Sequence, residues 1–586
     1  MRYAPAASLY NPFQPGLAMH SSMKHLAVGI LAWMGGLAAV AQSPGKFVPT
    51  GSMAKTRVAS SATLLKNGRV LVAGGYYDNS IDLATAELYD PSTGAFTPTG
   101  NMTAARAWHS ATLLLDGRVL IAGGMDSRGL RSAELYDPAT GTFTGTADMN
   151  AEHSSANLLS DGRVLITGSG SAEIFDPLTG VFMAAGPLTN AGTSSGAILN
   201  SGLVLIPSYS DVSLYSVIGD SLNLVASLPG DHSEDQTVTL LSNGKVLISG
   251  GSTDFGFDGT TDGARLYDPR TGTIEGTGLM LGSRVYHTGT LLPGGRVLIV
   301  GGYNGPAYDT GIPVLTFGEQ YDPSTGSFTS AGSLVSLREA HTATLLPDGT
   351  VLIAGGVRYA NPPAELYFPP LRATSAASLT GPLAPESQAS LFGSRLAGAT
   401  ESADVLSPPT SLGGISLRIT DSSGTARMAR LLDVSPSRID FEVPAGTTSG
   451  KVTLEVVNSP SQISQAAAQI DNVAPALFAH EDNTAVAYTT HFERRRIPSD
   501  NPPVQLVLYA TGIRNRSSLA NVQCTIGGIS VPVDYAGPNN NGVPGLDQVN
   551  LRLIPTLKSG FQDLVLTVDG IPSNTVSVNI VSPGRN

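Results

Sequence analysis

The chain has 586 residues, of which 41% are hydrophobic and only 14% are charged, and it contains 67 glycines and 39 prolines. Few charges and many turn formers are typical of a globular all-β protein with short strands. The net charge of −12 argues against nucleic acid and anionic membranes as partners, and the single cysteine, Cys524, excludes an intrachain disulfide.

Residues 1–41 predict a secretory signal peptide. A basic start at 23–25 precedes the apolar run 26–38 and the small residues 39–41, which is the order found in signal peptides. Residues 1–22 carry no such pattern, which points to Met23 as the translation start. The apolar run is short for a membrane span. We therefore expect cleavage near Ala41 and a secreted or extracytoplasmic protein without a membrane span.

Residues 42–371 contain seven copies of one sequence unit. The second copy begins SATLLLDGRVLIAGG at Ser110, and two apolar runs joined by Asn-Gly or Asp-Gly predict a hairpin with a two-residue type I′ turn. A second hairpin follows, as in AELYDPATGTF from Ala133, where Asp-Pro and Gly make the turn. The turn glycines of the seven first hairpins are Gly68, Gly117, Gly162, Gly202, Gly244, Gly295 and Gly349.

Two hairpins make a four-stranded unit, and seven such units at this period predict a seven-bladed β-propeller. The last unit stops after AELYFPP, from Ala364, while an unmatched strand, GKFVPTGSM from Gly45, stands before the first unit. We expect this N-terminal strand to complete blade 7 and close the ring. The repeat resembles the kelch repeats in the central domain of galactose oxidase relatives.

Beyond residue 371 the period ends, and alternating strands such as GKVTLEVVN from Gly450 and DLVLTVDG from Asp563 take over. They predict two Ig-like β-sandwiches, at 372–472 and 473–586. The motifs SLGGISLRITDSSG in the first unit and TIGGISVPVDYAGP and GLDQVNLRL in the second resemble a C-terminal module common in secreted proteins of Acidobacteria. That resemblance implies secretion and attachment or display, without chemistry of its own.

One end of the propeller is the candidate binding face. The loops after the double glycines vary in length, whereas the hairpin turns at the other end are all tight, and variable loops on a rigid scaffold usually carry binding. Eight residues before the turn glycines lie three histidines, and four arginines stand three positions earlier. The candidate ligand-binding residues are Arg57, Arg106, Arg284, Arg338, His109, His287, His341, Trp108, Tyr286, Tyr76 and Tyr303.

Two interpretations of these residues stay open at this point. The side chains either cap the inner strands and solvate the axial channel, or they form a ring that binds a carboxylate or a sugar, with the aromatic residues as stacking surfaces. In the second interpretation, the change Arg284→Ala weakens binding and leaves folding intact.

The dipeptide Tyr286-His287 resembles the copper-binding motif of galactose oxidase relatives. The resemblance implies a second tyrosine, a cysteine bonded to it, and a histidine from the following sandwich, for which His491 is available. The propeller repeats contain no cysteine, however, and the Arg-x-x-His spacing recurs in blades 2 and 7. We therefore expect no metal, no cofactor and no catalytic residue.

The sequence predicts an exported, monomeric, non-enzymatic recognition or scaffold protein that binds an extracellular carbohydrate or protein ligand on the variable-loop face. The alternatives are a secreted carbohydrate-active enzyme, either a galactose oxidase-like copper oxidase or a lyase, and a structural surface-display protein.

Overall fold

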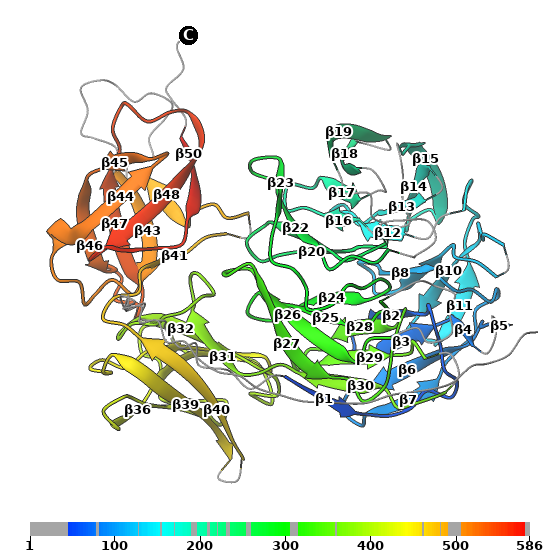
Figure 1. Cartoon of the computed structure of the whole chain (residues 1–586), viewed down its shortest axis with the longest axis horizontal. Coiled ribbons are helices and arrows are strands. Elements are labelled where there is room, and N and C mark those ends of the chain that lie inside the picture. Colours follow the sequence, from blue (N-terminus) through cyan, green and yellow to red (C-terminus); the bar gives the residue numbers. More distant parts are fainter. Residues whose placement is uncertain are drawn as a thin grey trace, which may run out of the picture. The chain divides into compact units, whose positions relative to one another are not determined.

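The structure is a computed structural model, and nearly all of its regular elements are β-strands (Figure 1). The predicted signal peptide and its cleavage site lie outside the described residues. In the described part, no helix is long and apolar enough to cross a membrane. The described residues are 45–77, 81–126, 128–152, 155–168, 170–188, 196–207, 211–218, 221–229, 235–252, 259–304, 314–357, 360–459, 462–480, 482–489 and 505–580.

Seven four-stranded antiparallel sheets form the blades of a propeller. Blade 4 keeps four strands although its repeat has Pro207-Ser208 where most other repeats have the double glycine. Blades 1 to 4 comprise β2 (Ser61–Leu64), β3 (Val70–Ala73), β6 (Ala86–Asp90) and β7 (Ala95–Pro98); β8 (Ser110–Leu113), β9 (Val119–Ala122), β10 (Ala133–Asp137) and β11 (Thr142–Gly145); β12 (Ser155–Leu158), β13 (Val164–Gly168), β14 (Ser171–Asp176) and β15 (Val181–Pro187); β16 (Ala197–Ile198), β17 (Val204–Pro207), β18 (Asp211–Ile218) and β19 (Ser221–Pro229). Blades 5 to 7 comprise β20 (Thr237–Leu240), β21 (Val246–Ser249), β22 (Ala264–Asp268) and β23 (Thr273–Gly276); β24 (Thr288–Leu291), β25 (Val297–Val300), β26 (Phe317–Asp322) and β27 (Ser327–Ser333); β28 (Thr342–Leu345), β29 (Val351–Ala354), β30 (Glu365–Phe368) and β1 (Lys46–Pro49).

The N-terminal strand closes the ring, as predicted. Strand β1 pairs antiparallel with β30, with Phe47 opposite Tyr367, and completes the sheet of blade 7. In Figure 1 the blue β1 lies beside the green β30. Seven hydrophobic clusters join consecutive blades, and one of them joins blade 7 to blade 1 through Leu352 and Val70. Each blade therefore buries both faces of its sheet against its two neighbours.

The first turn of each blade differs from the type I′ turn that we predicted. In blade 1 the Leu65 amide donates to the Arg69 carbonyl at 2.8 Å, which leaves a three-residue loop, and within that loop only Gly68 has a positive φ, of 82°. The side chain of Asn67 accepts a hydrogen bond from the Arg69 amide. This bond favours a type I turn at Asn67, and the left-handed glycine then restores the strand direction.

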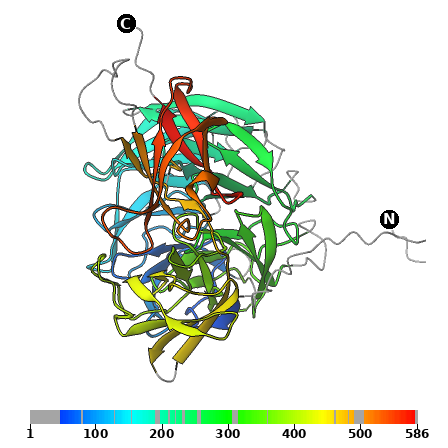
Figure 2. The ribbon, with the colours of Figure 1, turned by 90° about the vertical axis from the view of Figure 1, so that its left-hand side faces the viewer.

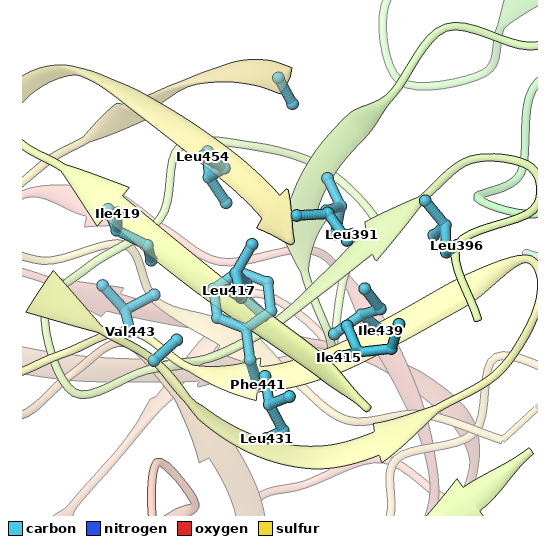
Figure 3. Close-up of a cluster of buried hydrophobic side chains, with 14 of the residues drawn as sticks. Leu391, Leu396, Ile415, Leu417, Ile419, Leu431, Ile439, Phe441, Val443 and Leu454 are labelled. Carbon is cyan, nitrogen blue, oxygen red and sulfur yellow. The ribbon is translucent and has the colours of Figure 1, made fainter. Parts of the chain in front are cut away.

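The strands after residue 371 form two units, each of two sheets around its own core. The first has β31 (Arg372–Ser375), β32 (Gln388–Phe392), β33 (Glu401–Ser402), β37 (Arg430–Val434) and β38 (Arg438–Glu442) in one sheet, and β34 (Ser411–Leu412), β35 (Ile415–Thr420), β36 (Ala426–Met428), β39 (Gly450–Ser459) and β40 (Gln462–Ile470) in the other. The long strands β39 and β40 run side by side in both views (Figures 1 and 2). Leu417 and Phe441, from opposite sheets, meet in the buried core (Figure 3).

The second unit repeats this two-sheet plan. Its sheets are β41 (Ala476–Leu477), β42 (Ala487–Thr489), β43 (Gln505–Thr511), β46 (Val533–Pro538) and β47 (Asp547–Arg552), and β44 (Val522–Ile526), β45 (Ile529–Val531), β48 (Gly560–Val568), β49 (Ile571–Pro572) and β50 (Val576–Ile580). Cys524 is buried in its core, as expected for a small apolar side chain. The Ig-like assignment, the domain boundaries and the resemblance to the secreted module stay predictions.

Candidate functional site

The four candidate arginines are buried inside the blades and do not line an exposed channel mouth. Their side chains are at most 1% exposed, and each guanidinium pairs with a glutamate from the third strand of its own blade. In blade 2, Arg106 lies 2.9 Å from Glu134 and donates to the Gly123 carbonyl at the same distance. The four pairs are Arg57–Glu87, Arg106–Glu134, Arg284–Glu319 and Arg338–Glu365.

The partner glutamates are structural residues that sequence reasoning missed. Besides holding the arginine, the Glu134 carboxylate accepts a hydrogen bond from the Thr103 amide at 2.7 Å, and Glu87 accepts one from the Ala54 amide at 2.8 Å. Each glutamate thus fixes the segment that leads into its blade. The signal was present in the sequence, because this glutamate is the second residue of AELY in blades 1, 2 and 7 and of GEQY in blade 6.

The three candidate histidines lie in the joints between blades. The Nε2 atom of His109 in blade 2 is 2.8 Å from the Ser61 hydroxyl in blade 1. His287 and Thr237 repeat this contact between blades 6 and 5, at 3.1 Å, and so do His341 and Thr288 between blades 7 and 6.

The double glycine makes room for this joint. A Cβ atom on Gly74 would lie 2.4 Å from the Arg106 carbonyl oxygen and 2.6 Å from Cε1 of His109, both in the next blade. The amide of Gly75 also donates to the Arg106 carbonyl, at 2.9 Å. The Arg-x-x-His segment of one blade and the double glycine of the preceding blade therefore form a single contact between the two blades.

Burial keeps these histidines neutral. Desolvation, reinforced by Arg106, lowers the pKa of His109 to about 3, and desolvation together with Arg338 does the same for His341. Desolvation by burial also lowers the pKa of His287 well below its usual value. Neutral, buried rings of this kind cannot attract a carboxylate ligand by charge.

Just before these joint residues runs a ring of left-handed residues, here called the inner ring. Each has a φ between 45° and 55°, a backbone angle that residues other than glycine rarely adopt. The backbone links the ring: the Ala340 amide donates to the Tyr286 carbonyl, and the Trp108 amide donates to the Ala59 carbonyl. Its described members are Ala59, Trp108, Asp235, Tyr286 and Ala340.

Aromatic side chains meet at the centre of the inner ring. The ring centroids of Trp108 and Tyr286 are 5.2 Å apart and those of Tyr286 and Tyr303 are 5.8 Å apart, with the planes tilted by 48° and 44°. Trp108 belongs to blade 2 and Tyr286 to blade 6, so their contact spans the mouth of the axial channel. Trp108 and Tyr286 are partly exposed and Tyr303 is buried. We call these three residues the axial platform.

A carboxylate borders the platform. The phenol of Tyr286 donates a hydrogen bond to Asp235 in blade 5, and burial first, then Asp235, raises the pKa of Tyr286 well above its usual value. Tyr76 also lies close enough to act on this phenol. Asp235 was not among the predicted residues. It occupies the same repeat position as Trp108 and Tyr286, and that alignment could have revealed it.

The residues present do not fit a copper centre of the galactose oxidase kind. His287 lies in the joint between blades 5 and 6, where its Nε2 faces Thr237, while the phenol of the adjacent Tyr286 is directed to Asp235. Within the described ranges, no three His, Cys, Asp or Glu side chains come together as a metal site. Cys524 is buried in another unit, and His491 lies outside the described residues.

Comparisons with known proteins agree with the fold. Residues 109–150 match the family model of the Kelch motif. Two galactose oxidase sequences from Gibberella zeae are 32% identical to this chain over 120 residues, which is 19% of this chain and 18% of theirs. A structure described as a novel fungal alcohol oxidase of the AA5 family, in complex with copper, is 17% identical and covers 73% of this chain and 99% of its own, with a TM-score of 0.50. The chain thus matches less than a fifth of the length of these curated relatives.

Proposed function

The chain carries a kelch-type, galactose oxidase-like β-propeller, and we propose that this propeller is an extracytoplasmic recognition module that binds a carbohydrate at its axial mouth. The ligand lies on the axial platform, at the end of the propeller that also bears the variable loops. The protein carries out no redox chemistry in this proposal.

The observation that carries the proposal is the meeting of Trp108 and Tyr286 across the propeller axis. Aromatic faces offer a flat apolar surface against which a sugar ring packs, while their polar atoms stay available for hydrogen bonds. Both residues have a backbone conformation that is costly for their type, and such strain clusters at functional sites. Asp235 adds an acceptor for hydroxyl groups at the edge of the same surface.

Tryptophan fluorescence offers a direct test. The chain has two tryptophans, Trp33 and Trp108, and only Trp108 lies in the propeller. A glycan array should identify bound sugars, and titration with one of them should change the emission of Trp108. The variant Trp108→Ala lacks this reporter, so its affinity is measured by titration calorimetry. The change should weaken binding by roughly tenfold or more, the scale of a lost aromatic contact.

A matched control separates this effect from a general loss of aromatic surface. Tyr488 is 46% exposed in the second C-terminal unit, and Tyr488→Ala should leave sugar binding unchanged. Binding of a sugar with equal affinity to the Trp108→Ala variant, or the absence of any glycan ligand, would contradict the proposal.

The alternative is an oxidase, and it rests on the similarity to galactose oxidase and on the Tyr286-His287 dipeptide. Metal analysis and an assay of primary alcohol oxidation decide between the two. We expect neither copper uptake nor oxidation. Stoichiometric copper that is lost in the His287→Ala variant, together with oxidase activity, would replace the recognition proposal. The buried positions of the arginines and histidines give no support to a lyase that would use them. A structural display protein would bind no sugar on the glycan array.

A further inference from the structure

Three carboxylates lie at the end of the propeller that bears the axial platform. Asp235 lies against Tyr286. Asp82 in the blade 1 loop and Asp126 in the blade 2 loop lie near each other: burial raises the pKa of Asp82, and the negative charge of Asp126 raises it further. Asp82 also pairs in β5 (Ile81–Asp82) with Tyr76 of β4 (Tyr76–Tyr77).

Basic side chains also occur at this end of the propeller, and the exposed Arg128 stands two residues from Asp126 in the blade 2 loop. The buried arginines of blades 1, 2, 6 and 7 each pair with a glutamate inside the blade. The ammonium group of Lys55 lies over the ring of Tyr77, 4.7 Å from its centroid. The chain as a whole carries a net charge of −12, which favours the approach of cations over anions.

Aromatic faces beside a carboxylate are a combination that favours a cation. The faces of tryptophan and tyrosine attract an ammonium group through their negative quadrupole. A carboxylate gives the same group a charge-assisted hydrogen bond, which is stronger than one between neutral partners. A neutral sugar would use the rings but would gain much less from the carboxylate.

We infer that the carbohydrate bound at the axial mouth carries a free amino group, as in a 2-amino-2-deoxy sugar. Its ring packs on Trp108 and Tyr286, and its ammonium group binds Asp235. This inference rests on the proposed function and narrows its ligand class.

The test compares oligosaccharides that differ only in charge. Glucosamine oligomers and the N-acetylated oligomers of the same length are titrated into the protein at pH 6, where the free amine is protonated, with Trp108 emission as the readout. We expect the amine form to bind roughly tenfold to a hundredfold more tightly, the scale of a charge-assisted hydrogen bond. The preference should shrink as salt is raised.

The change Asp235→Asn keeps the shape of the side chain and removes its charge. It should abolish the preference for the amine and leave the affinity for the N-acetylated form within about threefold. Asp126→Asn removes one charge from the same face of the propeller and should change the preference much less.

Failure of the inference and failure of the proposed function give different results. Equal binding of the two oligomers, or a preference for the N-acetylated form, would overturn the inference while leaving carbohydrate recognition in place. A preference for the amine that survives Asp235→Asn would show that this carboxylate is not its source and would also overturn the inference. Binding of neither oligomer, with no other glycan bound on an array, would overturn both.

Discussion

A buried ion pair such as Arg106–Glu134 costs much to desolvate, and it is stable only when both partners are present. We expect Arg106→Ala to lower the free energy of unfolding of the propeller by about 3–5 kcal/mol, because it leaves Glu134 buried without its partner. Urea unfolding monitored by Trp108 emission measures this loss. The control is Arg69→Ala, because the Arg69–Asp90 pair is exposed and contributes about 1 kcal/mol or less. Similar losses in the two variants would contradict this role.

The same reasoning changes the expectation for Arg284. Its side chain is fully buried and pairs with Glu319, whose pKa burial raises despite the nearby arginine. Arg284→Ala should therefore impair folding, and any loss of ligand binding in that variant would follow from the loss of structure. The expectation of intact folding assumed that Arg284 precedes the strand and does not fill the core, whereas the structure buries its side chain completely.

The buried histidines predict acid sensitivity. The pKa of His341 falls from about 6.5 in the unfolded chain to about 3 in the folded chain. Between these values the unfolded state binds more protons, so the free energy of unfolding should be highest above pH 6.5 and fall as the pH drops toward 3. A protonated ring would also bury its Nδ1 hydrogen, which has no acceptor in the structure.

The variant His341→Gln tests this linkage. Glutamine does not titrate and can still bind the Thr288 hydroxyl. The difference in unfolding free energy between pH 7 and pH 4.5 should be smaller in this variant than in the unmodified protein. An unchanged difference would show that His341 does not titrate on unfolding in this range.

At the scale of the element, the contact between neighbouring blades requires glycine just after the second strand of a blade, because a side chain there would press on the next blade. Gly74 has a φ of 63°, and its Cβ would press on the Arg106 carbonyl, whereas Gly68 has a φ of 82° and nothing within 4 Å. Gly74→Ala should therefore cost roughly 2–4 kcal/mol, from backbone strain and overpacking together. Gly68→Ala should cost about 1 kcal/mol, from backbone strain alone. Thermal unfolding of both variants checks the difference, and equal costs would argue against the contact.

The hairpins could be predicted from the sequence because their signals are local and repeat seven times. The glycine of each first turn was found correctly, but the turn type was wrong, since Asn67 suits either turn and only its side-chain hydrogen bond to Arg69 decides. The arginines were misread for a different reason. Each lies 27–35 residues from its glutamate, and no local pattern shows that the two meet.

The inner ring lies beyond what sequence patterns reveal. Trp108 and Tyr286 have a left-handed backbone that their residue types do not favour, so the conformation follows from contacts between blades. Both side chains were candidates as stacking surfaces, but their contact across the axis required the curvature of the whole ring. Asp235 went unnoticed because it was not aligned with Trp108 and Tyr286, which stand at the same position of their repeats.

At the scale of the whole molecule, a propeller is stable only if its first and last blades meet. The segment around β1 makes this connection: the Thr50 amide donates to the Ala364 carbonyl of blade 7 at 2.7 Å, and the Thr50 hydroxyl lies 3.0 Å from the Tyr89 hydroxyl of blade 1. Phe47 packs on Tyr367 with ring centroids 4.8 Å apart. One strand therefore fills the gap between blades 6, 7 and 1.

Removal of this strand should open the ring. A protein that starts at Ala54 lacks β1 and exposes the edge of β30, a row of unpaired backbone groups that another chain can pair with. Compared with a protein that starts at Gln42, it should melt at a lower temperature and aggregate, which thermal scans with light scattering would detect. Phe47→Ala keeps the β1 backbone and should cost about 3–5 kcal/mol through the lost aromatic packing. Equal melting temperatures for the two truncated proteins would mean that blades 7 and 1 hold together without β1, and that their shared hydrophobic cluster is enough to close the propeller.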